Sequence, residues 1–169
     1  MTKLPLLALC SALALAACAP RPAVELGPDG QPLPVAYTIT PAEEAQIGPR
    51  MQANIATLRA GSGLAPLVLN PQLSMAAAAH ARDMSAQNRA WHFGSDGSSA
   101  LDRAKRVGYF GPVFENISES YENDIATLNA WMEQRDTRDV IMDPAATQFG
   151  IGWFQEPSRK IWWVLVVGA

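Results

Sequence analysis

The stretch Phe149–Val167, FGIGWFQEPSRKIWWVLVV, decides the fold of this chain. In its first part, FGIGW, bulky residues alternate with glycines, which is the period-two pattern of a strand with one bulky face and one nearly bare face. Its last part, residues 161–167, is an unbroken apolar run, as expected of a strand that is covered on both faces. Residues 155–160 contain a proline and form the loop between them. The stretch therefore predicts a β-hairpin.

The residues before this hairpin predict four helices and a further strand. Helices are expected over 42–60, 71–87, 99–107 and 124–134, because apolar residues recur there at three-to-four spacing or because breakers bound the segment. A strand is expected over 109–119.

Three positions refine these elements. Pro49 marks a kink or a late start of the first helix. Asn70 is a plausible cap for the second helix, followed by Pro71 in its first turn. Pro112 places the predicted strand at an edge or a bulge of the sheet. The whole pattern predicts an α+β domain, an α-β-α sandwich in which helices cover a central antiparallel sheet.

The N-terminus is expected to direct export. Residues 1–17 have an early lysine, an apolar run too short for a comfortable membrane span, and then small residues, which is the pattern of a signal peptide. The stretch Leu15-Ala16-Ala17-Cys18 resembles the bacterial lipobox and implies cleavage before Cys18 and a lipid anchor on that residue, attached to the membrane by its acyl chains. Ordinary cleavage after Ala16, which would leave Cys18 as a free thiol, is the alternative.

A proline-rich tether is expected between the anchor and the folded domain. Residues 18–41 hold recurrent prolines and no apolar period, and the domain follows over 42–169. The alternative is an arm that packs on the domain, because Val35, Tyr37 and Ile39 alternate and would fit an edge strand. In a Gram-negative cell, Ala19 after the cysteine indicates the outer membrane, facing the periplasm.

Composition narrows the class of protein. The formal net charge is −3 at pH 7 and no basic run or patch is present, so nucleic acid is not an expected partner. After export only one of the two cysteines remains, so no internal disulfide is expected. The length that is left suits one domain with a real core.

Four segments together resemble one known family. They are GLAPLVLNPQLSMAAAAHARDM, HFGSDGSSALDRAKRVGY, ENISES and WMEQRDTRDVIMDPAATQFGIGW, followed by a terminal strand that carries tryptophans. In this order and spacing they resemble the CAP superfamily, also called SCP or the cysteine-rich secretory, antigen 5 and pathogenesis-related type, in its bacterial single-domain form. The resemblance covers about 42–169 and likewise implies an α-β-α sandwich.

The resemblance also implies a cleft lined by two histidines and acidic residues, where some relatives bind a divalent metal ion. His92 takes the position of the first histidine and Glu115 that of the family's glutamate. Thr137, six residues after Trp131, stands where the second histidine is expected, and Gln134 where eukaryotic members carry an acidic residue. The implied cleft is thus His92, Glu115, Thr137 and Gln134, with half of the usual groups missing.

The residues themselves point to a pairing of His92 with Glu115. In an extended ENISES segment, Glu115 shares a face with Val113 and Ile117, and a charge on a partly buried face needs a partner. His92 is the natural one, and such a pair is sensitive to pH. Two interpretations stay open: a functional site, or an ion pair that holds the loop onto the sheet. His80, on an apolar helix face, is expected to be a core histidine bonded to backbone.

The sequence does not supply a complete set of ligands for a metal ion or a complete set of catalytic groups for hydrolysis. Zinc usually takes at least three protein ligands, whereas His92 and Glu115 supply two and Thr137 is a poor third. A carboxylate from Asp136 or Asp139 would favour a harder cation, so a divalent ion is the single candidate cofactor.

Nucleophilic catalysis is equally incomplete. The sequence contains no GxSxG motif. Ser95, Ser98 and Ser99 are near His92 in the chain, but spacing alone does not establish a nucleophile, a base and an orienting acid.

Three functions follow as hypotheses. The first is an envelope lipoprotein whose domain binds a small apolar ligand, a lipid or an envelope partner through a degenerate His/Glu cleft. The second is a hydrolase or metal-dependent enzyme that uses His92 and Glu115. The third is a structural envelope protein with a vestigial cleft. The first is favoured, and whether the chain is an enzyme stays open, with the balance against it.

Overall fold

The structure is a computed structural model that describes residues 36–169. The predicted signal peptide, the lipidation site at Cys18 and the tether up to residue 35 lie outside the described residues. Within the described part, none of the helices combines the length and apolar character needed to span a bilayer.

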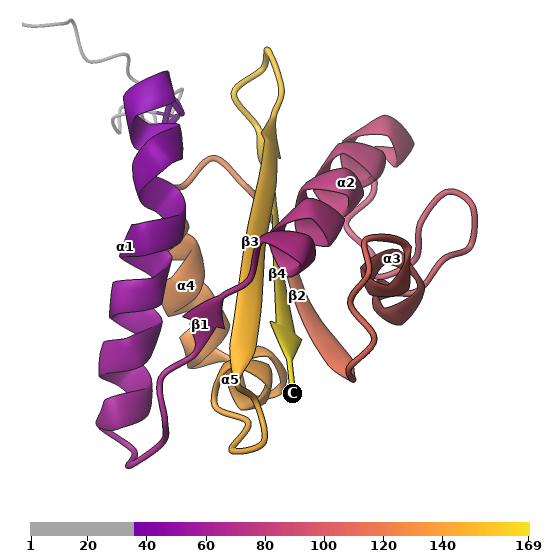
Figure 1. The fold of residues 1–169 in the computed structure, drawn as a ribbon. Helices are drawn as coiled ribbons and strands as arrows, with labels where there is room; N and C mark the ends of the chain where they lie inside the picture. The colour runs from indigo at the N-terminus through magenta and orange to yellow at the C-terminus, as the bar shows by residue number, and fades with distance from the viewer. Residues whose placement is uncertain (1–35) are drawn as a thin grey trace, which may run out of the picture. The chain divides into compact units, whose positions relative to one another are not determined.

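The described chain forms five helices and four strands (Figure 1). In chain order they are α1 (Pro41–Ala60), β1 (Val68–Leu69), α2 (Pro71–Gln87), α3 (Ala100–Arg106), β2 (Val113–Ser120), α4 (Asp124–Glu133), α5 (Arg135–Ile141), β3 (Gln148–Gln155) and β4 (Ile161–Gly168).

The sheet has the order β1-β3-β4-β2. The predicted hairpin is confirmed, since β3 and β4 pair antiparallel from Gln148 with Gly168 to Gln155 with Ile161. Strand β2 pairs antiparallel with the other side of β4 and is an edge strand, as Pro112 indicated. The expectation of a purely antiparallel sheet is wrong in one detail, because the two-residue β1 pairs parallel with β3.

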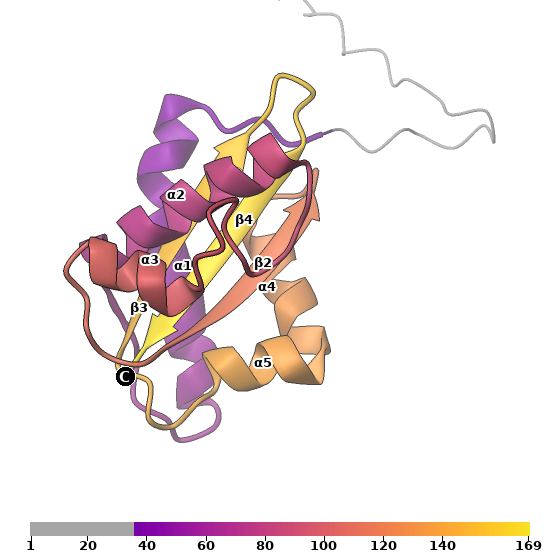
Figure 2. The same ribbon diagram turned by 90° about the vertical axis from the view of Figure 1, so that its right-hand side faces the viewer.

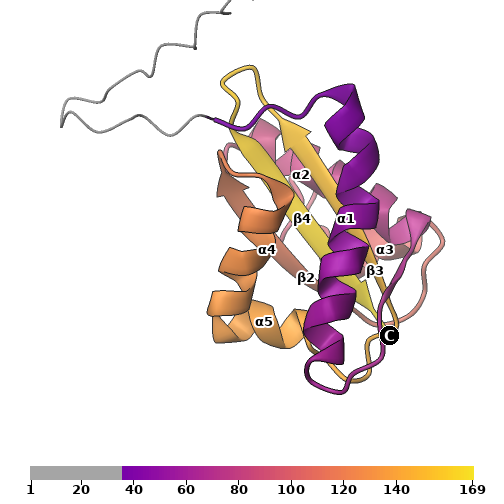
Figure 3. The same cartoon turned by 90° about the vertical axis from the view of Figure 1, so that its left-hand side faces the viewer.

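The predicted α-β-α sandwich is confirmed. One face of the sheet packs against α1, α4 and α5 around a core that includes Ile47, Leu128, Ile141 and Trp163 (Figure 3). The other face packs against α2 and α3 around a second core (Figure 2). Strand β4 lies between both cores and is buried along its whole length. Its tryptophans are therefore core residues.

Local capping sets the helix ends. The side chain of Asn70 accepts a hydrogen bond from the Leu73 N–H at 3.1 Å, which confirms the predicted cap of α2. Helix α3 has a capping box in which Ser99 and Asp102 each bond the other's backbone. Helix α1 begins at Pro41 and continues through Pro49, so the late start suggested for this helix is wrong.

Three features differ from the predicted elements. Strand β2 begins at Val113 rather than Tyr109, because the chain first bends and the Tyr109 ring turns into the core, with its hydroxyl bonded to the Ala169 carbonyl at 3.2 Å. Strand β1 and helix α5 were not predicted. Strand β1 has two residues, and α5 follows α4 after the single extended residue Gln134, so neither shows its own periodicity.

Residues 36–40 pack on the domain as an irregular segment. The Tyr37 N–H donates to the Tyr121 carbonyl at 3.0 Å, and the Ile39 N–H donates to Gln155 Oε1 at 2.9 Å. The alternative of a packed arm therefore describes these residues, although they form no strand.

Candidate functional site

A structured loop between α2 and α3 carries His92. Helix α2 ends at Gln87, and Asn88, which caps it, has a φ of 48° in the left-handed region. Further on, the Gly94 N–H bonds the Ser98 carbonyl at 2.8 Å, and Asp83 Oδ2 accepts from the Ser95 N–H at 2.7 Å. These bonds tie the loop to α2 and fix where His92 can lie.

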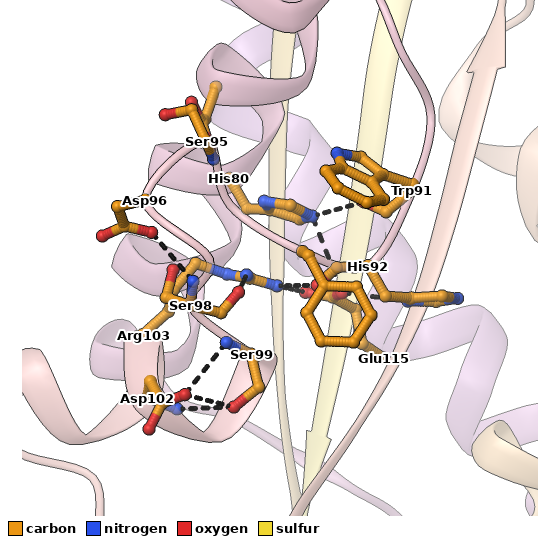
Figure 4. Close-up of polar contacts among 12 residues, drawn as sticks. His80, Trp91, His92, Ser95, Asp96, Ser98, Ser99, Asp102, Arg103 and Glu115 are labelled. Carbon is orange, nitrogen blue, oxygen red and sulfur yellow. Dashed lines mark hydrogen bonds and ion pairs between the residues drawn. The ribbon is translucent and has the colours of Figure 1, made fainter.

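Glu115 is the centre of the candidate site (Figure 4). It comes from the edge strand β2, and only 3% of its side chain is exposed. Its Oε1 lies 3.1 Å from His92 Nδ1, and its Oε2 accepts a hydrogen bond from Arg103 at 2.7 Å. The predicted pairing of His92 with Glu115 is confirmed. Since a carboxylate only accepts, Nδ1 of His92 donates, and its Nε2 faces away from Glu115.

Arg103 is the partner that sequence reasoning missed. It lies on α3 with 7% of its side chain exposed. Its guanidinium also donates to the Ser98 carbonyl at 2.8 Å and to the His92 carbonyl at 3.2 Å. Arg103 therefore neutralises Glu115 and holds both ends of the loop. The one sequence signal was an arginine four residues after a helix-capping serine, on the side of α3 that covers the sheet.

His80 is the fourth member of the cluster and lies on its buried side. It is fully buried on α2, and its Nε2 donates to the Trp91 carbonyl at 2.9 Å, which confirms a core histidine bonded to backbone. The same nitrogen lies 3.7 Å from Glu115 Oε1, a proximity that the sequence did not reveal. Among residues 36–169, Nδ1 of His80 has no hydrogen-bond partner. Burial lowers the pKa of His80 below its ordinary 6.5, and the nearby Glu115 carboxylate opposes that shift in part.

Because His80 is buried, we expect the protein to lose stability in mild acid. Because its pKa is lower in the folded protein than in the unfolded chain, protonation favours unfolding as the pH falls below 6.5. We expect the free energy of unfolding to fall by up to about 1.4 kcal/mol per pH unit in this range. Urea unfolding between pH 7 and 5 measures the slope, which should be smaller in His80→Asn. An NMR titration in which the His80 ring protonates above 6.5 would contradict this assignment.

Thr137 and Gln134 do not join the cluster. Thr137 Oγ1 donates to the Trp131 carbonyl at 2.6 Å, and its own carbonyl accepts from Asn116 Nδ2 at 2.8 Å. Thr137 thus links the end of α4 to β2. Gln134 is exposed at the junction of α4 and α5. No hydrogen bond or ion pair joins either of them to His92 or Glu115 in the described chain.

The other metal and nucleophile candidates also lie elsewhere. Asp136 and Asp139 line a separate hollow of about 170 Å³. Within residues 36–169, no group of three or more His, Cys, Asp or Glu side chains is placed to hold a metal ion. The three loop serines bond Asp83, Asp96 or Asp102 through backbone or side chain, and none of the described serines bonds the His92 ring. The cluster as it stands can hold the loop in place and expose one edge of the His92 imidazole to solvent.

The exposed face of the loop is aromatic. His92 has 57% of its side chain exposed, and Phe93 is 51% exposed. The Trp91 and Phe93 rings meet edge-on with centroids 5.7 Å apart, and the Arg89 guanidinium lies 3.9 Å over the Trp91 ring. We call Arg89, Trp91, His92 and Phe93 the aromatic loop. None of the three hollows described for this structure is lined by His92 or Glu115.

One family model matches more than half of the chain. Residues 52–167 match the model of the Cysteine-rich secretory protein family, CAP. The chain is 30% identical over 111 residues to the uncharacterized protein YkwD of Bacillus subtilis (strain 168), a match that covers 65% of this chain and 42% of YkwD. The chain thus spans less than half the length of this curated relative.

Solved structures share the fold. An outer surface protein from Borrelia burgdorferi superposes with a TM-score of 0.67 at 16% identity, over 79% of this chain and 98% of that one. An extracellular protein containing an SCP domain from Bacillus anthracis str. Ames superposes with a TM-score of 0.65 at 20% identity, over 78% of this chain and 44% of that one.

Proposed function

This chain belongs to the cysteine-rich secretory protein (CAP) family, and we propose that it is a binding protein of the bacterial cell envelope rather than an enzyme. The relatives with solved structures are outer surface or extracellular proteins. The proposed ligand is a small apolar molecule, a lipid or an apolar envelope partner. The proposed contact surface is the aromatic loop beside Glu115.

One observation carries the choice of binding over catalysis. Both oxygens of Glu115 are occupied, by Arg103 at 2.7 Å and His92 at 3.1 Å, and 3% of the side chain is exposed. A carboxylate that acts as a general base or metal ligand needs a reachable oxygen, which Glu115 does not offer. The aromatic loop, in contrast, leaves Phe93 half exposed beside the partly buried Trp91 ring, and this apolar surface supports contact with an apolar ligand or partner.

The predicted anchor fits the same role. A lipid on Cys18 would keep the domain at a membrane surface, where apolar ligands are concentrated. The Borrelia relative is described as an outer surface protein, which supports an envelope location for this chain. We therefore propose an exported lipoprotein, held at the outer membrane in a Gram-negative cell and facing the periplasm.

A fluorescent fatty acid is the probe that tests the proposed surface. We expect a pyrene-labelled fatty acid to bind the protein, and Phe93→Ala to bind it about tenfold more weakly, since an aromatic contact of this size contributes roughly 1.4 kcal/mol. Phe110→Ala is the matched control, because Phe110 is 78% exposed but lies outside the aromatic loop. Equal affinities of the two variants would contradict the proposal. Hydrolysis of the corresponding fatty acid ester, abolished by His92→Ala, would favour the enzyme alternative instead.

A further inference from the structure

The largest described hollow lies at the other edge of the sheet. It is a groove of about 410 Å³ over β3, whereas Glu115 belongs to β2 at the opposite edge. One wall comes from the start of α1 and the residues before it, the other from α2, and the floor is β3. Figure 1 shows the ribbons of α1 and α2 on either side of β3. The lining of this groove includes Glu44, Met75, Ala78, Arg82, Ile151 and Trp153.

The floor of this groove is an open strand edge. In the hairpin, the Glu156 N–H donates to the Lys160 carbonyl at 2.9 Å. Bonded pairs alternate in an antiparallel ladder, so Phe154 and Gly152 also direct their backbone groups toward β4. Ile151 and Trp153 direct their N–H and C=O groups the other way, into the groove.

Strand β1 leaves these groups uncovered. It pairs only as far as Phe149, whose carbonyl accepts from the Asn70 N–H at 2.7 Å, and the chain then turns into α2. No hydrogen bond to the main-chain N–H or C=O of Ile151 or Trp153 on this edge is found among residues 36–169. Unpaired groups along a strand edge are a template for a further strand.

Helix α2 makes the groove narrow. A Cβ on Gly152 would lie 2.1 Å from the Ala78 nitrogen, so the backbone of α2 lies directly on β3. Met75, Ala78 and Arg82 follow one another at helical spacing along the wall that results. Because walls flank the edge on both sides, a single extended chain is a better occupant than the sheet of a second copy, whose own helices would meet those walls.

The two walls carry opposite charges. Arg82 on the α2 wall and Glu44 on the α1 wall form no ion pair in the described part of the chain, and Arg82 lies 5.9 Å over the Phe154 ring. Successive side chains of a strand point to opposite sides. A strand in the groove would therefore direct one side chain to Arg82 and the next to Glu44.

We propose that this groove binds an extended polypeptide segment of a partner protein, which adds to the sheet as a strand beside β3. Its backbone pairs with Ile151 and Trp153. An acidic side chain faces Arg82, and an adjacent basic side chain faces Glu44. This peptide site is independent of the aromatic loop, because the two lie at opposite edges of the sheet.

Hydrogen exchange of the free protein is the first test. We expect the amides of Ile151 and Trp153 to exchange at least tenfold faster than those of Gly152 and Phe154, which bond β4. Equal protection of all four amides would mean that the edge is already covered, and would overturn the proposal.

A peptide titration is the second test. The probe is the blocked hexapeptide acetyl-Val-Thr-Glu-Lys-Thr-Val-amide, added up to millimolar concentration. We expect it to slow exchange at Ile151 and Trp153 at least tenfold and to leave Gly152 and Phe154 unchanged. The same peptide with alternate nitrogens methylated should bind at least tenfold more weakly, because it cannot donate to β3 on one edge. Equal binding of the methylated peptide would identify an apolar pocket instead of a strand site, and no effect at Ile151 and Trp153 would exclude the site.

A charge reversal tests the orientation of the peptide. Arg82→Glu is expected to weaken binding about fivefold, in line with a partly exposed ion pair of roughly 1 kcal/mol. Lys105→Glu is the matched control, since Lys105 is exposed on α3 and does not line the groove. Equal affinities of the two variants would contradict the assigned charge contact.

Discussion

Replacing Arg103 with methionine is expected to destabilise the protein by about 3–5 kcal/mol, because the Glu115 carboxylate would remain buried without its strongest partner. Methionine keeps most of the apolar volume of the arginine stem, so the loss reports the missing charge and hydrogen bonds rather than a cavity. The carbonyls of Ser98 and His92 would lose donors as well. Urea unfolding at pH 7 measures the loss.

Arg106→Met is the matched control for this prediction. Arg106 is on the same helix and pairs with Asp96 at 2.7 Å, but the two side chains are 58% and 50% exposed. Exposed ion pairs contribute about 0–1 kcal/mol, so this variant should unfold almost like the original protein. In Arg103→Met/Glu115→Gln, part of the stability should return because no buried charge remains. Equal losses in Arg103→Met and Arg106→Met would contradict the anchoring role of Arg103.

Gly152→Ala is expected to cost about 3 kcal/mol, since it overpacks the contact between β3 and α2. The new methyl group would lie 2.1 Å from the Ala78 nitrogen and 2.4 Å from the Ala77 carbonyl carbon. These are backbone atoms of a helix, which cannot turn aside as a side chain can. Strand β3 and α2 would have to separate along the whole interface. Thermal or urea unfolding measures the effect.

Gly61→Ala provides the comparison for Gly152→Ala. Gly61 follows α1 with φ of −59°, and a Cβ there would lie 3.4 Å from the nearest atom, the Leu58 carbonyl oxygen. This substitution should change stability by about 0.5 kcal/mol or less. If Gly152→Ala were tolerated equally well, the close approach of α2 to the sheet would be wrong.

Local sequence patterns predicted most of the fold. The alternation in FGIGW and the apolar run of 161–167 predicted the hairpin, and the cap at Asn70 predicted the start of α2. The same glycines also allow α2 to lie on β3, a role that alternation alone does not reveal. The two-residue β1 is too short to show any period, and its parallel pairing depends on contacts between distant residues.

Buried arginines are the main feature of the structure that the sequence did not predict. Arg59 is completely buried, and its guanidinium donates to the carbonyls of Ala65, Ile141, Asp143 and Ala146. Nothing local distinguishes it from a solvated arginine at the end of a helix. Arg103 is hidden in the same way, so the sequence suggested the pair of His92 and Glu115 but not the group that neutralises it.

Thermal unfolding of the protein with EDTA and with zinc, magnesium or calcium, repeated for His92→Ala, measures whether the Glu115 carboxylate is available to a cation. Because Glu115 is already occupied by Arg103 and His92, we expect no cation to change the melting temperature of either protein. A cation at 100 times its dissociation constant would stabilise the folded state by about 2.7 kcal/mol, which is a rise of several degrees. Such a rise, lost in His92→Ala, would make His92 a metal ligand and would contradict the role of Glu115 as an occupied anchor.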